Sequence, residues 1–168
     1  MTDRIEDMTI ENICPTTPED QVQINMLKQL AFHHDLFRLV FFGPLCADLR
    51  LHAKYALINK WKDKYDIQSI NFTDFAEEVL FAIHNGTWIA DLQHFVEPEV
   101  LLLDDLHLAV SKECTQEMLF ALVIKPRLEA KKITILFSEY SYDMLAVTLR
   151  DDLRNLLRLG AMRHGDYA

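Results

Sequence analysis

The chain has 168 residues, 50% of them hydrophobic, and a formal net charge of −9 at neutral pH. This length and apolar content predict one compact domain with a full hydrophobic core, and they leave little room for a second domain. The negative charge disfavours a general nucleic-acid binder, because such proteins need cations that replace phosphate counterions.

The first part of the chain predicts two helices on either side of a short strand. Residues 1–16 are polar, and we expect a flexible amino-terminal segment there. A helix should begin after Thr17, because Pro18 and the two acids that follow suit a first turn. The apolar run at residues 39–42 predicts a strand, and residues 47–64 predict the next helix.

The middle of the chain repeats this alternation. Residues 67–72 predict a strand. Asp74 and Glu77 then predict a capping box for a helix that ends near Gly86. A short helix is expected over residues 88–95.

Two further apolar runs, at residues 100–103 and 133–136, predict strands joined by a helix. Pro126 should end or kink that helix, because proline lacks a donor and clashes with the preceding turn. Nearly all-apolar strands that alternate with helices predict a three-layer α/β/α sandwich around a parallel sheet. We expect the runs at 39–42, 100–103 and 133–136 to be central strands.

Acidic residues stand where two of these strands end. Asp104 and Asp105 follow the first run, and Ser138 and Glu139 follow the second. Ligands bind at the carboxyl ends of the strands in open α/β sheets, so these acids mark the candidate site.

The cysteines and the apolar pattern indicate a cytoplasmic protein. Cys14, Cys46 and Cys114 are odd in number and form no Cys-x-x-Cys pair, which suits reduced thiols rather than disulfides or a zinc site. No apolar run approaches a membrane span, and the acidic amino-terminus is unlike a signal peptide. We therefore expect no membrane contact.

The segment LLLDDLHLAVSKECTQEMLF, residues 101–120, resembles the Walker B strand and following helix of the bacterial replication initiator DnaA, an AAA+ ATPase. The Asp-Asp pair and the Thr-Gln-Glu triplet carry the resemblance, which extends over about residues 38–160. It implies a P-loop NTPase fold of AAA+ type, with the core at residues 17–160. Residues 161–168 would form a tail that is too short for the family's helical lid.

In P-loop proteins a loop of the pattern Gly-x-x-x-x-Gly-Lys-Ser/Thr binds the phosphates of the nucleotide. Residues 43–50 correspond to it, and only Gly43 fits. Asp48 replaces the second Gly, Leu49 replaces the Lys, and Arg50 replaces the hydroxyl residue. The acid repels phosphate and the lost lysine removes an attraction, so we expect no bound nucleotide, no cofactor and no enzyme activity.

The remaining acids are interpreted as vestiges of the family's site. Asp104, Asp105 and Glu139 lie at the positions of its metal-binding acids and its nucleotide sensor. We expect them to accept hydrogen bonds from nearby backbone N–H groups, with an occasional cation as the alternative. The histidines show no metal-ligand spacing, so no metal site is predicted.

Arg150, Arg154 and Arg158 recur every four residues and predict a basic stripe along the last helix. Arg is favoured at interfaces, so the stripe is a candidate partner-binding surface. Pairing with Asp151 and other acids of the same chain is the alternative. Leu156 stands where the resembled family has an arginine that reaches the ATP of the next subunit.

These features predict a non-catalytic module that binds other proteins, as a regulator or adaptor in the initiation of DNA replication. The expected partner is the replication initiator or another AAA+ protein, and self-assembly is left open. One alternative is a residual nucleotide-binding switch or weak ATPase. The other is a direct DNA-binding module that uses the lysines around Trp61, which are Lys54, Lys60, Lys62 and Lys64.

Overall fold

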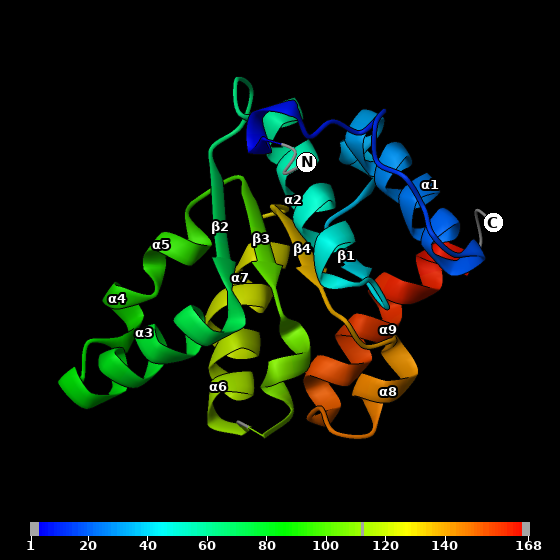
Figure 1. Ribbon diagram of the computed structural model, residues 1–168. Coiled ribbons are helices and arrows are strands. Elements are labelled where there is room, and N and C mark those ends of the chain that lie inside the picture. The colour runs from blue at the N-terminus through cyan, green and yellow to red at the C-terminus, as the bar shows by residue number, and fades with distance from the viewer. Residues whose placement is uncertain (1–3, 112, 166–168) are drawn as a thin grey trace.

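The structure, a computed structural model, describes residues 4–111 and 113–165. Four parallel strands form a sheet in the order β1-β4-β3-β2 (Figure 1). Their bounds are Leu39–Phe42 for β1, Ile67–Asn71 for β2, Val100–Asp104 for β3 and Ile133–Phe137 for β4. The register places Leu39 beside Thr134 and Val100 beside Ile133.

The prediction that β1 is a central strand is wrong, because β1 pairs only with β4 among the described strands. All four of its residues are nevertheless buried. Helix α9, Asp151–Gly165, packs against β1 and takes the place of a further strand in covering it. An all-apolar run therefore indicates that both faces of the strand are buried. It does not indicate a central place in the sheet, because a helix can cover an edge strand.

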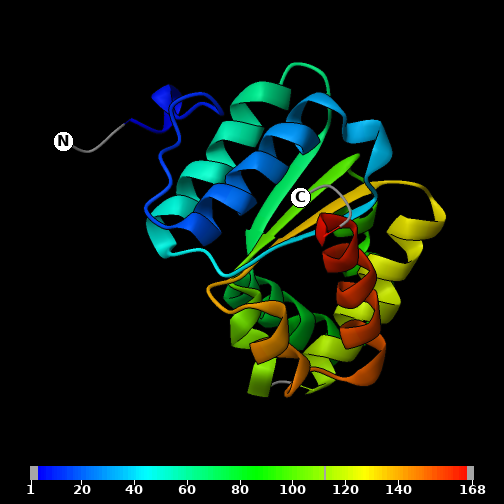
Figure 2. The same ribbon diagram turned by 90° about the vertical axis from the view of Figure 1, so that its right-hand side faces the viewer.

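Two helices cover one face of the sheet (Figure 2). They are α1, Pro18–Phe32, and α2, Ala47–Trp61. Their apolar side chains share a core cluster with Val40 and Phe42 of β1. Ile10 and Ile13 join this cluster, so the segment before α1 packs on the domain and is not the loose segment expected from its polar composition.

The other helices lie on the opposite side of the sheet, where a second core cluster includes Leu39 and Phe41. Alternate residues of β1 thus point into different clusters, as the pleat of a strand requires. The three-layer α/β/α architecture is confirmed. These helices are α3 Phe72–Asn85, α4 Trp88–Asp91, α5 Gln93–Val96, α6 Glu113–Met118, α7 Lys125–Glu129, α8 Tyr142–Ala146 and α9.

Short polar side chains fix where the helices begin. Thr17 caps α1 as predicted, since its side chain accepts a hydrogen bond from the backbone N–H of Asp20. The capping box predicted at Asp74 is wrong. Helix α3 begins earlier, because the side-chain oxygen of Asn71 accepts from the backbone N–H of Asp74 at 2.9 Å. Gly86 ends α3 in a left-handed conformation, as predicted.

Pro126 does not end the helical path that links β3 to β4. A π-helical segment, Leu119–Ile124, runs directly into α7, and Pro126 lies in the first turn of α7. A proline is tolerated in a first turn because its missing N–H would have no intrahelical partner there.

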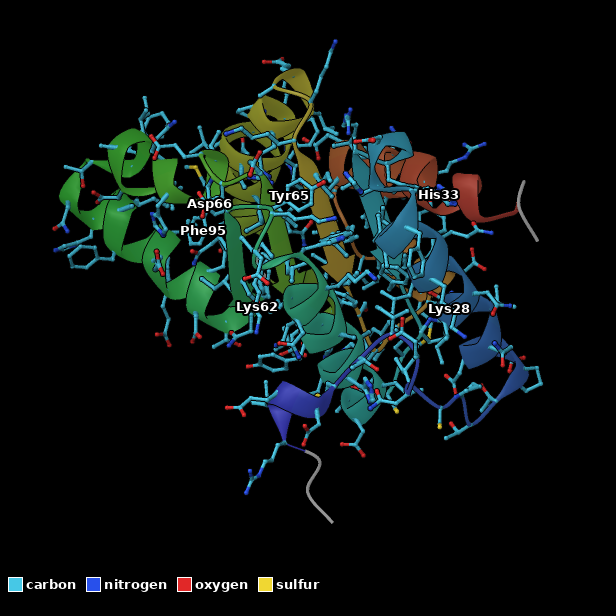
Figure 3. All side chains as sticks on the ribbon, turned by 90° about the horizontal axis from the view of Figure 1, so that it is seen from above. Lys28, His33, Lys62, Tyr65, Asp66 and Phe95 are labelled. Carbon is cyan, nitrogen blue, oxygen red and sulfur yellow. The ribbon has the colours of Figure 1, made fainter. Side chains whose placement is uncertain are left out.

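Arg127 is fully buried and was not singled out in the sequence. Its guanidinium donates to the hydroxyl of Thr134 at 2.9 Å and to the carbonyls of Phe95 and Pro98 at 2.9 and 2.8 Å. It also donates to the carbonyl of Ile133 at 2.5 Å. Burial lowers the pKa of Arg127 to about 10. The residue ties α7 to β4 and to the turn before β3, near the labelled Phe95 in the view onto the amino ends of the strands (Figure 3).

No helix within the described residues is long and apolar enough to cross a membrane.

Candidate functional site

The loop from β1 to α2 is held by contacts within the protein. The backbone N–H of Gly43 donates to the side-chain oxygen of Gln23 at 3.2 Å. The N–H of Leu45 donates to the carbonyl of Ser138 at 3.1 Å. A Cβ atom at residue 43 would lie 2.4 Å from the carbonyl oxygen of Tyr140, so Gly43 is required by a close backbone approach.

The two residues after this loop point in different directions. Asp48 is exposed in the first turn of α2. Leu49 is buried in the core cluster between α1, α2 and the sheet. Leu49 is therefore a packing residue.

Arg50 forms the centre of the candidate site. Its Nε donates to Oδ1 of Asp104 at 3.0 Å, and its Nη2 donates to Oδ1 of Asp105 at 2.8 Å. Its Nη1 donates to the carbonyl of Leu45 at 2.7 Å. The side chain is buried, so one guanidinium joins both acids at the end of β3 to the loop that follows β1.

The acid pair has two further contacts. Oδ1 of Asp104 accepts from the backbone N–H of Asp105 at 2.7 Å. Asp105 has a φ of 58°, an uncommon value for a residue other than glycine. Lys54, one helical turn after Arg50, places its Nζ 3.6 Å from Oδ2 of Asp104. Of the three acids expected to accept from backbone N–H groups, Asp104 does so in the described hydrogen bonds, and Arg50 is a partner that was not predicted.

A local signal for that partner was present. Arg50 and Lys54 are four residues apart, so a helix places them on one face. That face lies beside the strand end that carries Asp104 and Asp105. Two cations at this spacing after a strand, together with two acids after the next buried strand, indicate an internal ion-pair cluster.

Glu139 contacts His107, whereas Asp104 and Asp105 contact Arg50. Its backbone N–H donates to Nδ1 of His107 at 3.3 Å, and its carboxylate lies 3.8 Å from Nε2 of the same ring. The ring of Tyr140 packs on His107 with centroids 5.2 Å apart. These three residues form a separate cluster at the carboxyl ends of β3 and β4.

The arginines of α9 are partly engaged within the chain. Arg150 lies 3.6 Å from the carboxylates of both Glu117 and Asp152. Arg154 pairs with Asp151 and also donates to the carbonyl of Ala146 at 3.3 Å. The pairing alternative thus holds for Arg150 and Arg154.

The two other singled-out residues of α9 differ in exposure. Arg158 is exposed, and Leu156 is half-buried against the second core cluster. The start of α9 is fixed by Gln116, whose side chain accepts from the N–H of Arg150 at 2.9 Å and donates to the carbonyl of Ala109 at 2.7 Å.

The lysines near Trp61 do not surround an exposed indole ring. Trp61 is buried in the core. Lys54 faces Asp104, and Lys60 lies over the ring of Phe32 at 4.4 Å. Bases stack only on accessible rings, so Trp61 cannot serve as a stacking platform. Within the described residues, no group of three or more His, Cys, Asp or Glu side chains could hold a metal ion.

The parallel sheet and its helical layers match an α/β fold that is P-loop-like and AAA+-like. Comparison with solved structures places it more narrowly. Domain III of the replication initiation protein DnaA from Thermotoga maritima matches with a TM-score of 0.78 and 17% identity, over 92% of this chain and 65% of that chain. AMPPCP-bound DnaA from Aquifex aeolicus matches with a TM-score of 0.77 and 21% identity, over 91% of this chain and 48% of that one.

DnaI matches with a TM-score of 0.66 and 15% identity, over 98% of this chain and 88% of that chain. The chain spans about half the length of the first DnaA structures that it matches. No protein-family model and no curated protein matches the sequence. The fold is a DnaA-like core, which confirms the resemblance seen in residues 101–120.

Proposed function

We propose that this protein is a non-catalytic DnaA-like module that acts by binding other proteins, as a regulator or adaptor in the initiation of DNA replication. The structures that support this role are replication initiators and DnaI. The proposed partner is the replication initiator or another AAA+ protein. The proposed place of action is the cytoplasm.

The observation that carries the proposal is the position of Arg50. An acid pair at this strand end can hold Mg²⁺ and a nucleotide only if its oxygens are free, and here both carboxylates bind the guanidinium of Arg50. Binding a metal would release a buried cation, and leaving such a charge unpaired costs about 3–5 kcal/mol. The ion pairs therefore compete directly with nucleotide binding.

The loop supports the same conclusion. The N–H groups of Gly43 and Leu45 donate to Gln23 and Ser138. A phosphate loop needs such N–H groups to be free. Leu49 is buried, so no cation stands in for the lysine of the pattern. Asp48 adds negative charge beside the loop.

Titration calorimetry with Mg-ATP and with Mg-ADP tests the absence of catalysis. We expect no heat beyond dilution at millimolar nucleotide, no phosphate release, and no rise in melting temperature. A micromolar dissociation constant would overturn the proposal. Arg50→Ala is the informative companion, because freeing the acids should still create no nucleotide site without a lysine at residue 49.

The interaction is tested separately with purified proteins. Size-exclusion chromatography of this protein with the replication initiator from the same organism should yield a mixed complex in the presence of ATP. Elution of the two proteins at their separate volumes, at concentrations of tens of micromolar, would remove the initiator as the partner. Arg158→Glu measures what α9 contributes, and Val22→Glu, at an exposed position on α1, is its matched control.

A further inference from the structure

Helices α3 and α4 expose an unusual number of large apolar side chains. Leu80 is 56% exposed, Phe81 66% and Ile89 65%. In the described part of the chain, no other stretch of ten residues exposes as many such side chains as residues 80–89. We call this set the α3–α4 surface; its members are Leu80, Phe81, Ile83, Trp88 and Ile89.

The fold does not need these side chains for its core. The opposite face of α3 supplies the buried residues, among them Phe75 and Val79. Figure 1 shows α3 and α4 projecting beyond β2, on the side of the sheet away from α8 and α9. Exposed large apolar side chains concentrated on one projecting pair of helices are typical of a protein-binding site.

A groove with an acidic rim adjoins the α3–α4 surface at Phe81. The groove has a volume of about 510 Å³ and is lined by Phe81, Glu77, Glu78 and Asp91. Glu77 and Glu78 lie one helical turn before Phe81, so their carboxylates stand beside its ring. Asp91 reaches the same groove from α4.

The charged side chains that line this groove are all acidic. From residue 66 to residue 111 the sequence contains no lysine and no arginine. His94 also lies at the rim, with its Nε2 2.9 Å from Glu78. Phosphates would be repelled here, because nucleic-acid binding needs cations in place of counterions. A second copy of this surface would also be repelled, because it would bring the same acids face to face.

We propose that the α3–α4 surface binds a basic amphipathic helix of a partner protein, with its apolar side chains on Phe81, Leu80 and Ile89 and its Lys or Arg side chains on Glu77, Glu78 and Asp91. The inference rests on the proposed function and names the surface that carries it out. An amphipathic helix laid in an apolar groove is a recurring mode of peptide recognition. The acidic rim selects a basic helix over a neutral or acidic one.

The test uses the whole protein and a defined probe. The probe is a fluorescein-labelled helical peptide with leucines on one face and lysines on the other, and its leucine–glutamate counterpart is the charge control. Fluorescence anisotropy should show binding of the lysine peptide, weakening as salt rises, and no binding of the glutamate peptide.

Variants then locate the binding site. The double substitution Leu80→Ser with Phe81→Ser should weaken the lysine peptide by about 10-fold or more, as expected for central apolar anchors. The matched control, Met144→Ser with Val147→Ser, changes two exposed side chains near α8, and it should change affinity less than about 2-fold. The double substitution Glu77→Gln with Glu78→Gln should make the affinity for the lysine peptide less dependent on salt concentration. All of these positions are exposed, so circular dichroism and melting temperature should stay near those of the native protein.

Several results would overturn the inference. One is equal loss of affinity in the α3–α4 and control variants, and another is failure of the lysine peptide to bind. A third is binding of a single-stranded oligonucleotide that Phe81→Ser abolishes, and a fourth is a homodimer that the same substitution dissociates.

Capture of the purified initiator that survives Leu80→Ser with Phe81→Ser would refute this surface and leave the proposed function standing. Nucleotide binding by the native protein would refute the proposed function and leave the peptide result unaffected.

Discussion

Replacing Arg50 with methionine should destabilise the domain strongly, because two buried hydrogen bonds and one partly buried hydrogen bond depend on its guanidinium. Two of them hold carboxylates, at 3.0 and 2.8 Å, and the third holds a carbonyl at 2.7 Å. Arg50→Met keeps the apolar stem and removes the charge, which leaves Asp104 and Asp105 near each other without their main cation. Breaking a buried pair in this way costs about 3–5 kcal/mol.

Lys54→Met provides the matched comparison. Its ammonium lies 3.6 Å from Asp104, beyond hydrogen-bonding distance, so this substitution should cost at most about 1 kcal/mol. For a domain of this size each kcal/mol lowers the melting temperature by about 2–4 °C. We therefore expect a fall of roughly 6–20 °C for Arg50→Met and of a few degrees for Lys54→Met.

Urea unfolding followed by tryptophan fluorescence measures both free energies, since Trp61 is buried and becomes exposed on unfolding. A double-mutant cycle of Arg50→Met with Asp104→Asn should give a coupling of about 1–3 kcal/mol. Equal effects of the two cation substitutions, or a cycle that closes additively, would show that Arg50 does not hold the strand ends together.

Two further predictions concern structural residues. Arg127→Met should lower the free energy of unfolding by about 3–5 kcal/mol, because several buried carbonyls lose their donor. Thr134→Val removes one acceptor and should lower it by about 1 kcal/mol. Thermal melts measure both effects. Asp20→Asn tests the cap of α1. The pKa of Asp20 is lowered, mainly by the hydrogen bond from the Thr16 side chain, so its carboxylate stabilises the fold above the unfolded pKa and the effect is lost as pH falls through the folded value. The variant should be less stable than the native protein at neutral pH, and the difference should shrink as the pH falls below the ordinary aspartate pKa of about 3.9 in acid titrations of urea unfolding.

The strands could be predicted closely from the sequence because each buried run is short, apolar and followed by a polar residue. β1 begins and ends where the run of residues 39–42 does, and β3 and β4 extend one residue further than predicted. Thr17 and Gly86 also act as predicted, since caps depend on neighbouring residues alone. Asn71 was overlooked as the cap of α3 because the strand was extended through it.

Features that depend on distant residues could not be read in the same way. Arg50 lies 54 residues from Asp104 in the chain, and only the folded sheet brings the two together. The burial of Arg127 was not predicted, because most of its partners are backbone carbonyls that leave no trace in the sequence. The arginines of α9 were correctly placed on one helix, but their pairing required the positions of Glu117 and Asp152.

The acids around the exposed α3–α4 surface also affect how copies of the protein meet in solution. An apolar patch of this kind would promote aggregation on a neutral molecule, but here a net charge of −9 and an acidic rim make close approach unfavourable. That repulsion reaches about 8 Å at physiological ionic strength and about 3 Å in molar salt. The carboxylates of the rim therefore contribute both to colloidal stability and to the selection of a basic partner. A substitution that neutralises them would weaken both properties together.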